Sequence, residues 1–152
     1  TGVRIGVGVA QGLAFGADLP VYGVSTLAAM AQAAHRVHQA HQVVAAIDAR
    51  MSEVYIASFQ LDAEGIMQPV SEEQLLGYSD AAAVAQFPLV GSGSTLLQQE
   101  QTQYKDLSAT AQDIATIARV LAQREAWVSA EYALPVYLRD NAWKKIPEQG
   151  KS

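Results

Sequence analysis

The chain has 152 residues, half of them hydrophobic, with no cysteine and a formal net charge of −5. This length suffices for one compact domain, or for two small subdomains that share an interface. The absence of cysteine excludes disulfides and thiolate metal sites, and we therefore expect a protein of the reducing cytoplasm. The acidic balance argues against independent affinity for nucleic acid, because such proteins usually present a basic face.

The first stretch, residues 1–14, is apolar with one charge and is predicted to form a helix despite its glycines. It is neither a membrane span, which needs roughly 18 apolar residues, nor a secretory signal, which needs a basic leader. Small residues four apart form a ridge on one helical face that another helix can approach closely. Two such ridges are present: Gly2, Gly6 and Ala10, and Gly8, Gly12 and Gly16.

Each glycine destabilises a helix by about 1 kcal/mol relative to alanine, so packing against another element must offset several such penalties. We therefore expect this helix to be gripped by a neighbour. The chain also begins at Thr1, directly inside the predicted helix, and we expect the natural protein to begin earlier.

A turn at residues 16–20 and a short buried strand at residues 21–24 are predicted next. Ser25 is predicted to cap a second helix. The alternation of helix, strand and helix indicates an α/β protein. Apolar residues at helical spacing mark the buried face of the second helix: Leu27, Met30, Ala31 and Ala34.

Three strands joined by short turns are predicted to form an antiparallel meander: residues 42–47, 53–61 and 66–70. A short helix at residues 81–86, with Asp80 as its cap, should precede a strand that runs into a glycine loop. Later in the chain, Thr110 and Asp113 resemble a capping box at the start of a longer helix.

The glycine loop, Gly91-Ser92-Gly93, could offer backbone N–H groups to a phosphate. Such a cradle needs a helix N-terminus behind it, and neither common phosphate-binding fingerprint is present, so a plain turn is favoured. The histidines at positions 35, 38 and 41 lie about one helical turn apart. No carboxylate or cysteine accompanies them, so solvated histidines at a helix end are favoured over a metal site.

Asp48, Arg50 and Glu53 cluster at a strand turn, where catalytic carboxylates often lie. The structural alternative is a hairpin turn in which Asp48 bonds its own backbone and Arg50 pairs with Glu53. Ser25 lacks a nucleophile motif, and its role as a helix cap explains it. The tail from Leu134 on is expected to be an extended arm, and its basic residues favour a solvated arm over an RNA contact: Arg139, Lys144 and Lys145.

Three runs together resemble one family. Residues 1–6, with 12–14 and Pro20, resemble the second half of a G-P-G-S-F-T-G-x-R-I-G segment. Residues 46–51 and 53–55, Ala-Ile-Asp-Ala-Arg-Met and Glu-Val-Tyr, are similar to the same family's hairpin. Residues 135–139 and 143–145, Pro-Val-Tyr-Leu-Arg and Trp-Lys-Lys, are similar to its C-terminal signature. The family is TsaB, also called YeaZ, the bacterial partner subunit in making threonylcarbamoyladenosine at position 37 of tRNA.

The resemblance implies an actin-like (Hsp70/sugar-kinase ATPase-like) fold, with two α/β subdomains around a cleft. It assigns residues 1–40 to a remnant of the first subdomain, 41–138 to the second subdomain and 139–152 to an extended tail. Family members carry a further segment before the position of Thr1, including a meander and a helix.

The resemblance also argues against catalysis. The related catalytic subunit, TsaD, binds a metal through both histidines of a G-V-N-H-M-E-G-H run, and Thr26 and Met30 stand at those positions here. Asp48 is followed by residues with side chains, whereas an actin-like phosphate turn needs glycines there. We therefore expect a non-catalytic chain that binds no cofactor or metal itself, with ATP and a divalent metal in its partner subunits.

The expected partners are a TsaD-like catalytic subunit and a TsaE-like ATPase, with tRNA contacted only through the complex, no membrane, and a homodimer when the chain is alone. In the family, the pairing surface includes the helix that begins at Thr1. The residues expected at this interface are Gly2, Val3, Gly6, Val7, Ala10, Gln11 and Ala14.

Two alternatives remain open. The family was long catalogued beside glycoprotease-like peptidases, so the chain could be a protease-like enzyme acting on TsaD, although the sequence offers no nucleophile–base pair or metal motif. It could instead be a regulatory subunit that binds nucleotide through Gly91, Ser92 and Gly93.

Overall fold

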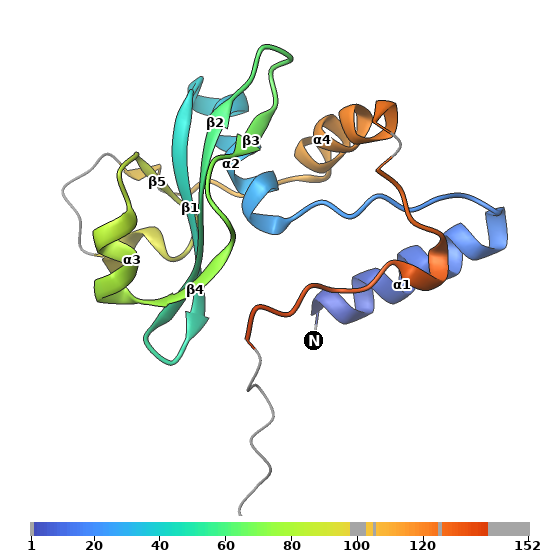
Figure 1. Cartoon of the computed structure of the whole chain (residues 1–152), viewed down its shortest axis with the longest axis horizontal. Coiled ribbons are helices and arrows are strands. Elements are labelled where there is room, and N and C mark those ends of the chain that lie inside the picture. The colour runs from blue at the N-terminus through green and yellow to red at the C-terminus, as the bar shows by residue number, and fades with distance from the viewer. Residues whose placement is uncertain (1, 98–102, 105, 125, 140–152) are drawn as a thin grey trace, which may run out of the picture.

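The computed structural model describes residues 2–97, 103–104, 106–124 and 126–139 (Figure 1). Its helices are α1 (Gly2–Ala17), α2 (Thr26–His38), α3 (Tyr78–Val84) and α4 (Ala111–Gln123), with short 3-10 helices η1 (Ser94–Leu97) and η2 (Ala130–Tyr132). Its strands are β1 (Gln42–Arg50), β2 (Glu53–Leu61), β3 (Met67–Pro69), β4 (Gln74–Gly77), β5 (Leu89–Val90) and β6 (Gln103–Tyr104). None of the described helices has the length and apolar character that crossing a bilayer requires.

One sheet contains all six strands, in the order β3-β2-β1-β5-β6, with β4 also paired to β2. Strands β1, β2 and β3 are antiparallel, which confirms the predicted meander. Strand β5 joins β1 in parallel, and β6 continues in parallel beyond it. Parallel neighbours need a crossover, and here α3 lies on the path that returns the chain to β5.

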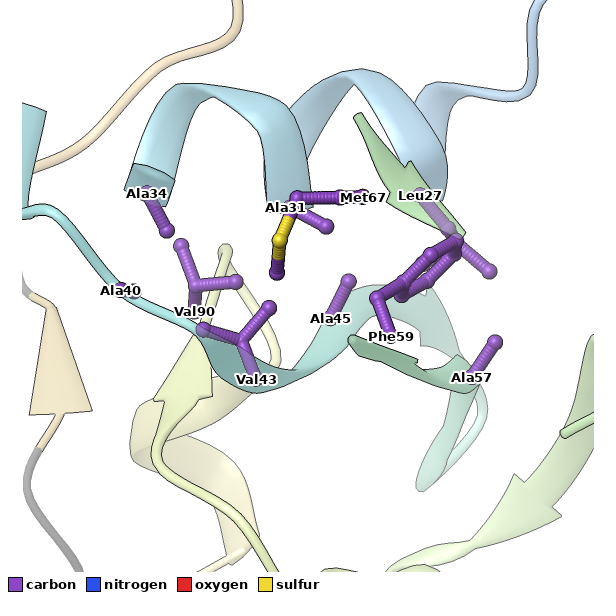
Figure 2. Close-up of a cluster of buried hydrophobic side chains, with 10 residues drawn as sticks. All are labelled: Leu27, Ala31, Ala34, Ala40, Val43, Ala45, Ala57, Phe59, Met67 and Val90. Atoms are coloured by element: carbon purple, nitrogen blue, oxygen red, sulfur yellow. The ribbon is translucent and has the colours of Figure 1, made fainter. Parts of the chain in front are cut away.

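Helix α2 covers one face of the sheet, as Figure 2 shows for the buried side chains between them. Leu27, Ala31 and Ala34 of the helix pack against Val43 and other residues of the sheet, including Phe59. These contacts confirm the predicted buried face of α2. The predicted cap is also confirmed, because Ser25 Oγ accepts a hydrogen bond from Leu27 N–H at 3.1 Å.

The opposite face of the sheet is covered by α3 and η1. Val44 and Ala46 of β1 point there and pack with Val54, Ile56 and the helix residue Ala81. Four consecutive residues of β1 are therefore buried, which explains why its sequence is apolar throughout instead of alternating.

Helix α4 packs on α2, away from the sheet. Ile117 and Val120 of α4 form a small apolar cluster with Ile66, which precedes β3. The predicted capping box is confirmed: Asp113 Oδ2 accepts hydrogen bonds from Thr110 N–H at 2.8 Å and from Thr110 Oγ1 at 3.0 Å.

Two local predictions are wrong. Residues 21–24 do not form a buried strand: Val21 makes an isolated antiparallel bridge to Val128, and the residues after it have no regular structure. The helix predicted at residues 81–86 with Asp80 as its cap begins earlier, at Tyr78, because β4 leads directly into α3. Gly77 is its N-cap, and Asp80 lies inside its first turn.

Helix α1 lies apart from the sheet, beside the last described residues of the chain (Figure 1). The predicted helix is confirmed and is three residues longer than expected at its C-terminal end, reaching Ala17. The proposed subdomain boundary after residue 40 stays a prediction, and α2 packs on the sheet that follows it.

Candidate functional site: the surface of helix α1

The side of α1 that faces the rest of the chain is narrow. Ala14 is buried, and Gln11 Nε2 donates a hydrogen bond to the carbonyl oxygen of Ala130 at 2.9 Å. Near the start of the helix, Arg4 Nε donates to the phenol oxygen of Tyr137 at 2.9 Å, and the Arg4 guanidinium carbon lies 5.3 Å from the centre of that ring. Segment 130–137 therefore runs along α1 and holds one side of it.

The rest of α1 presents large apolar side chains to solvent. Leu13 is 71% exposed and Phe15 is 79% exposed. A soluble surface rarely gathers this much apolar area on one element unless another molecule covers it. The exposed members are Val3, Ile5, Val9, Leu13 and Phe15.

The glycine ridges of α1 are open within this chain. A Cβ atom placed on any of its glycines would meet nothing within 4 Å. Close approach to these glycines is therefore not explained by contacts among the described residues. The glycines concerned are Gly2, Gly6, Gly8, Gly12 and Gly16.

The seven predicted interface residues divide between these two sides. Gly2, Val3, Gly6 and Ala10 are exposed, as a docking surface requires, whereas Ala14 is buried. Val7 and Gln11 are half-buried on the side that faces the C-terminal segment. Whether the set forms an interface stays a prediction.

Sequence reasoning missed a second apolar row on α1. Ile5, Val9 and Leu13 are four residues apart and all exposed, so they form a stripe on one helical face. This four-residue spacing is present in the sequence, where the two glycine ridges give the stronger signal. A shallow groove beside α1 is lined by Gln11, Gly12, Phe15, Ala130 and Glu131.

The turn between β1 and β2 holds the predicted cluster of Asp48, Arg50 and Glu53. Asp48 Oδ1 accepts a hydrogen bond from the backbone of Arg50 at 2.8 Å, as the structural alternative expected. The expected Arg50–Glu53 pair is wrong: Arg50 Nη1 lies 3.5 Å from Asp48 Oδ2, and Glu53 pairs with Arg139 instead. Glu53 and Arg139 are too far apart in the sequence for local spacing to reveal their pairing.

The glycine loop packs against the sheet. Gly91 has a φ of +103°, and a Cβ atom there would lie 2.3 Å from the carbonyl oxygen of Ala46. Gly93 N–H donates to that same oxygen at 2.9 Å, and Ser92 Oγ accepts from Asp48 N–H at 3.1 Å. Close backbone packing thus explains both glycines, and nucleotide binding by Gly91, Ser92 and Gly93 stays a prediction.

The histidines have ordinary structural partners. The ring of His38 stacks on Tyr104 with centroids 4.7 Å apart, and His35 Nδ1 lies 3.1 Å from the carbonyl oxygen of Ala40. In the part of the chain that the structure describes, no group of three or more potential ligands is arranged to hold a metal ion. Of the basic tail residues, Arg139 is described, and Lys144 and Lys145 lie outside the described residues.

A known protein family matches most of this chain. The family model "TsaD: tRNA N6-adenosine threonylcarbamoyltransferase" matches residues 1–135. Together with the mixed sheet and its flanking helices, this match defines an actin-like (Hsp70/sugar-kinase) protein and confirms the predicted fold class.

Individual relatives narrow the family. The chain is 42% identical to "tRNA threonylcarbamoyladenosine biosynthesis protein TsaB" of Escherichia coli (strain K12), over 97% of this chain and 69% of that protein. The protein of the same name from Haemophilus influenzae is 40% identical over the same shares. The solved structure "YeaZ from Pseudomonas aeruginosa" superposes with a TM-score of 0.83 and 40% identity, over 91% of this chain and 68% of that chain. The chain belongs to the TsaB (YeaZ) family of tRNA threonylcarbamoyladenosine biosynthesis proteins.

Proposed function

We propose that this chain is a non-catalytic subunit that pairs through α1 with a TsaD-type catalytic subunit in the biosynthesis of tRNA threonylcarbamoyladenosine. A TsaE-type ATPase completes the complex, and tRNA is contacted through the complex. In the absence of the TsaD-type subunit, two copies of the chain associate through the same helix.

The observation that carries this proposal is the open surface of α1. The glycines of the predicted interface, Gly2 and Gly6, leave room for the backbone of a second helix, and apolar side chains flank them. Helices that pack through small residues approach closely and gain many dispersion contacts. A subunit whose own fold uses only one side of such a helix offers the rest to a partner.

The chemistry of α2 supports a non-catalytic role. Met30, which stands at a metal-histidine position of TsaD, is half-buried and packs against the core beneath α2. Thr26 is exposed and offers a single hydroxyl, which is a poor ligand for a divalent ion without carboxylate or imidazole neighbours.

The test is a pair of glycine substitutions on the same helix. Gly6→Leu fills the ridge that contains Gly2 and Ala10, whereas Gly8→Leu fills the other ridge; neither meets an atom of this chain. We expect Gly6→Leu to weaken association with the TsaD-type subunit by roughly 10- to 100-fold in calorimetry, because overpacking costs about 1–3 kcal/mol. Gly8→Leu, which changes helix propensity equally, should bind nearly as the parent does.

Unchanged affinity of the Gly6→Leu protein would sink the assignment of this ridge. The two alternatives, a protease-like enzyme and a nucleotide-binding regulator, stay predictions that no described geometry favours. Titration with ATP, alone and with the TsaD-type subunit, tests the second of them, and incubation with that subunit followed by mass analysis tests the first.

A further inference from the structure

The last described segment of the chain connects two distant parts of the fold. We call residues 130–139 the strap. It begins at η2 beside the C-terminal half of α1, passes Arg4 near the start of that helix, and ends at the turn between β1 and β2 (Figure 1). The strap therefore links α1 to the sheet by a route that does not pass through α2.

Arg139 anchors the end of the strap by three contacts. Its Nη2 atom donates a hydrogen bond to the carbonyl oxygen of Ala49 at 2.9 Å and lies 2.6 Å from Glu53 Oε2. Its Nη1 atom donates to the sulfur of Met51 at 3.2 Å. The guanidinium thus holds residues on both sides of the turn at once.

The pairing with Glu53 is partly shielded from water. The side chain of Arg139 is 20% exposed and that of Glu53 is 33% exposed, and the Oε2 atom itself is buried. No described group hydrogen-bonds this oxygen, so the ion pair with the Arg139 guanidinium supplies its compensating charge. A buried carboxylate oxygen without a cation is strongly disfavoured, so loss of Arg139 would leave Glu53 with an uncompensated charge.

The turn that Arg139 brackets has an unusual backbone. Arg50, Met51 and Ser52 have φ values of +63°, +56° and +60°, a left-handed conformation that non-glycine residues rarely adopt. Such a turn persists only where surrounding contacts enforce it. Hydrogen bonds from the Arg50 backbone N–H to Asp48 Oδ1 and from Arg139 to the carbonyl oxygen of Ala49 supply those contacts.

Apolar burial along the strap is slight beyond its first residue, Ala130, which is buried. Leu134 is 69% exposed and Val136 is 82% exposed, so these side chains contribute little packing within the chain. The polar anchors are at its start and near its end: Gln11 on Ala130, Arg4 on Tyr137 and Arg139 on the turn.

We propose that Arg139 is a positioning residue, which locks the strap to the β1–β2 turn and thereby fixes the orientation in which α1 is presented to a partner. The mechanical part of this inference concerns the chain alone. Its last step, the effect on association, rests on the proposed function.

Hydrogen exchange measures the mechanical part directly. Arg139→Gln keeps a polar side chain but removes the cation. We expect amides of the turn and of α1 to exchange about tenfold faster, because the free energy of a hydrogen bond to a charged group corresponds to about a tenfold change in the opening equilibrium. The matched control is Arg124→Gln, which removes an Arg–Glu pair of similar length, Arg124 to Glu64 at 3.0 Å, on the exposed surface. It should leave α1 exchange unchanged.

A double-mutant cycle distinguishes a lock from general loss of stability. Glu53→Gln should accelerate α1 exchange, but less than Arg139→Gln, which also removes the contacts with Ala49 and Met51. The double variant should show no further increase over Arg139→Gln, because Glu53 acts on the strap through Arg139. Circular dichroism confirms that each variant is folded. If the two effects add, or if α1 exchange stays at its original rate in a folded Arg139→Gln protein, the lock is refuted.

Calorimetry with the TsaD-type subunit tests the last step, for which we expect about tenfold weaker association of Arg139→Gln. If the parent chain does not bind that subunit while α1 exchange responds as expected, the proposed function fails and the mechanical lock stands. If the parent binds, and Arg139→Gln loosens α1 without weakening association, the orienting role is refuted.

Discussion

Arg36 of α2 binds Asp113 of α4 through two parallel hydrogen bonds, from Nε to Oδ1 at 2.7 Å and from Nη2 to Oδ2 at 3.0 Å. The Asp113 side chain is 1% exposed and also caps its own helix through Thr110. One carboxylate thus closes the N-terminus of α4 and ties that helix to α2. Bidentate pairs of this kind are the stronger class of ion pair.

Replacement of Asp113 should therefore destabilise the fold. We expect Asp113→Asn to lower the free energy of unfolding by about 2–3 kcal/mol, because it removes the charge-assisted bonds and leaves part of the site unsatisfied. Urea unfolding followed by circular dichroism measures the change. Glu64→Gln, which breaks the exposed pair with Arg124, should change stability by less than about 1 kcal/mol. Equal losses in the two variants would contradict the argument.

The same carboxylate should make stability depend on pH. Burial raises the pKa of Asp113, but hydrogen bonds from Arg36 and Thr110 outweigh it, and the pKa in the folded chain lies below its usual value. The unfolded chain then binds more protons as the pH falls below about 4, the ordinary aspartate value, and stability is lost as pH falls toward the folded pKa. Burial also raises the pKa of Asp62, but hydrogen bonds from the Ile66 and Glu64 backbones and from the Gln68 side chain outweigh it. The pKa of Asp62 therefore also lies below its usual value, and this residue adds to the loss of stability in acid.

Unfolding measured at a series of pH values between about 2 and 6 checks this prediction. The parent chain should lose stability steadily on acidification. The Asp113→Asn protein should show a shallower slope, and the lowered pKa of Asp62 contributes to what remains. A slope identical to that of the parent would show that Asp113 does not carry the linkage.

The two glycines with positive φ on the sheet side of the fold should respond differently to alanine. At Gly91, a Cβ atom would lie 2.3 Å from the Ala46 carbonyl oxygen, and we expect Gly91→Ala to destabilise the chain by about 3 kcal/mol or more. Gly65 has a φ of +80° but open space around it, so Gly65→Ala should cost only the backbone strain of about 1–2 kcal/mol. Thermal unfolding compares the two, and a smaller loss at Gly91 than at Gly65 would refute the close-packing explanation.

The exposed stripe of Ile5, Val9 and Leu13 on α1 leads to a prediction about self-association. Val9 is 58% exposed and contacts the interior little, so Val9→Glu should leave the unfolding free energy within about 0.5 kcal/mol of the parent. If α1 pairs with a second copy, the substitution should shift the chain toward monomer in sedimentation analysis at a fixed concentration. Dimers that persist in the Val9→Glu protein would exclude this stripe from the contact.

The central strands could be predicted from the sequence because their patterns are local and strong. The continuous apolar residues in β1 follow from the burial of both faces of the sheet, and the alternation in β2 is the period of two that is typical of a strand. The Thr110–Asp113 box marks the start of α4. The strand expected at residues 21–24 failed for the opposite reason. Val21 has the right composition, but strand formation depends on partners elsewhere, and only Val128 pairs with it among the described residues.

The glycines of α1 predict a contact surface on this helix, and that surface stays a prediction. The side of α1 that faces the rest of the chain depends on Tyr137 and Ala130, which lie far along the chain and could not be identified from local spacing. The partner of Glu53 was equally hidden, because Arg139 reaches the turn across a separation of 90 positions to Ala49. Tertiary contacts at such distances leave no periodic signature in the sequence.

The open glycines of α1 also determine how association would register in a calorimeter. Each glycine leaves the unpartnered helix closer to unfolding than alanine would, so docking should order the backbone as well as bury apolar side chains. Ordering opposes binding through entropy, and burial of apolar area gives a negative heat-capacity change. The enthalpy of association should therefore become steeply more negative on warming, more so than for a preformed, alanine-rich helix of the same size.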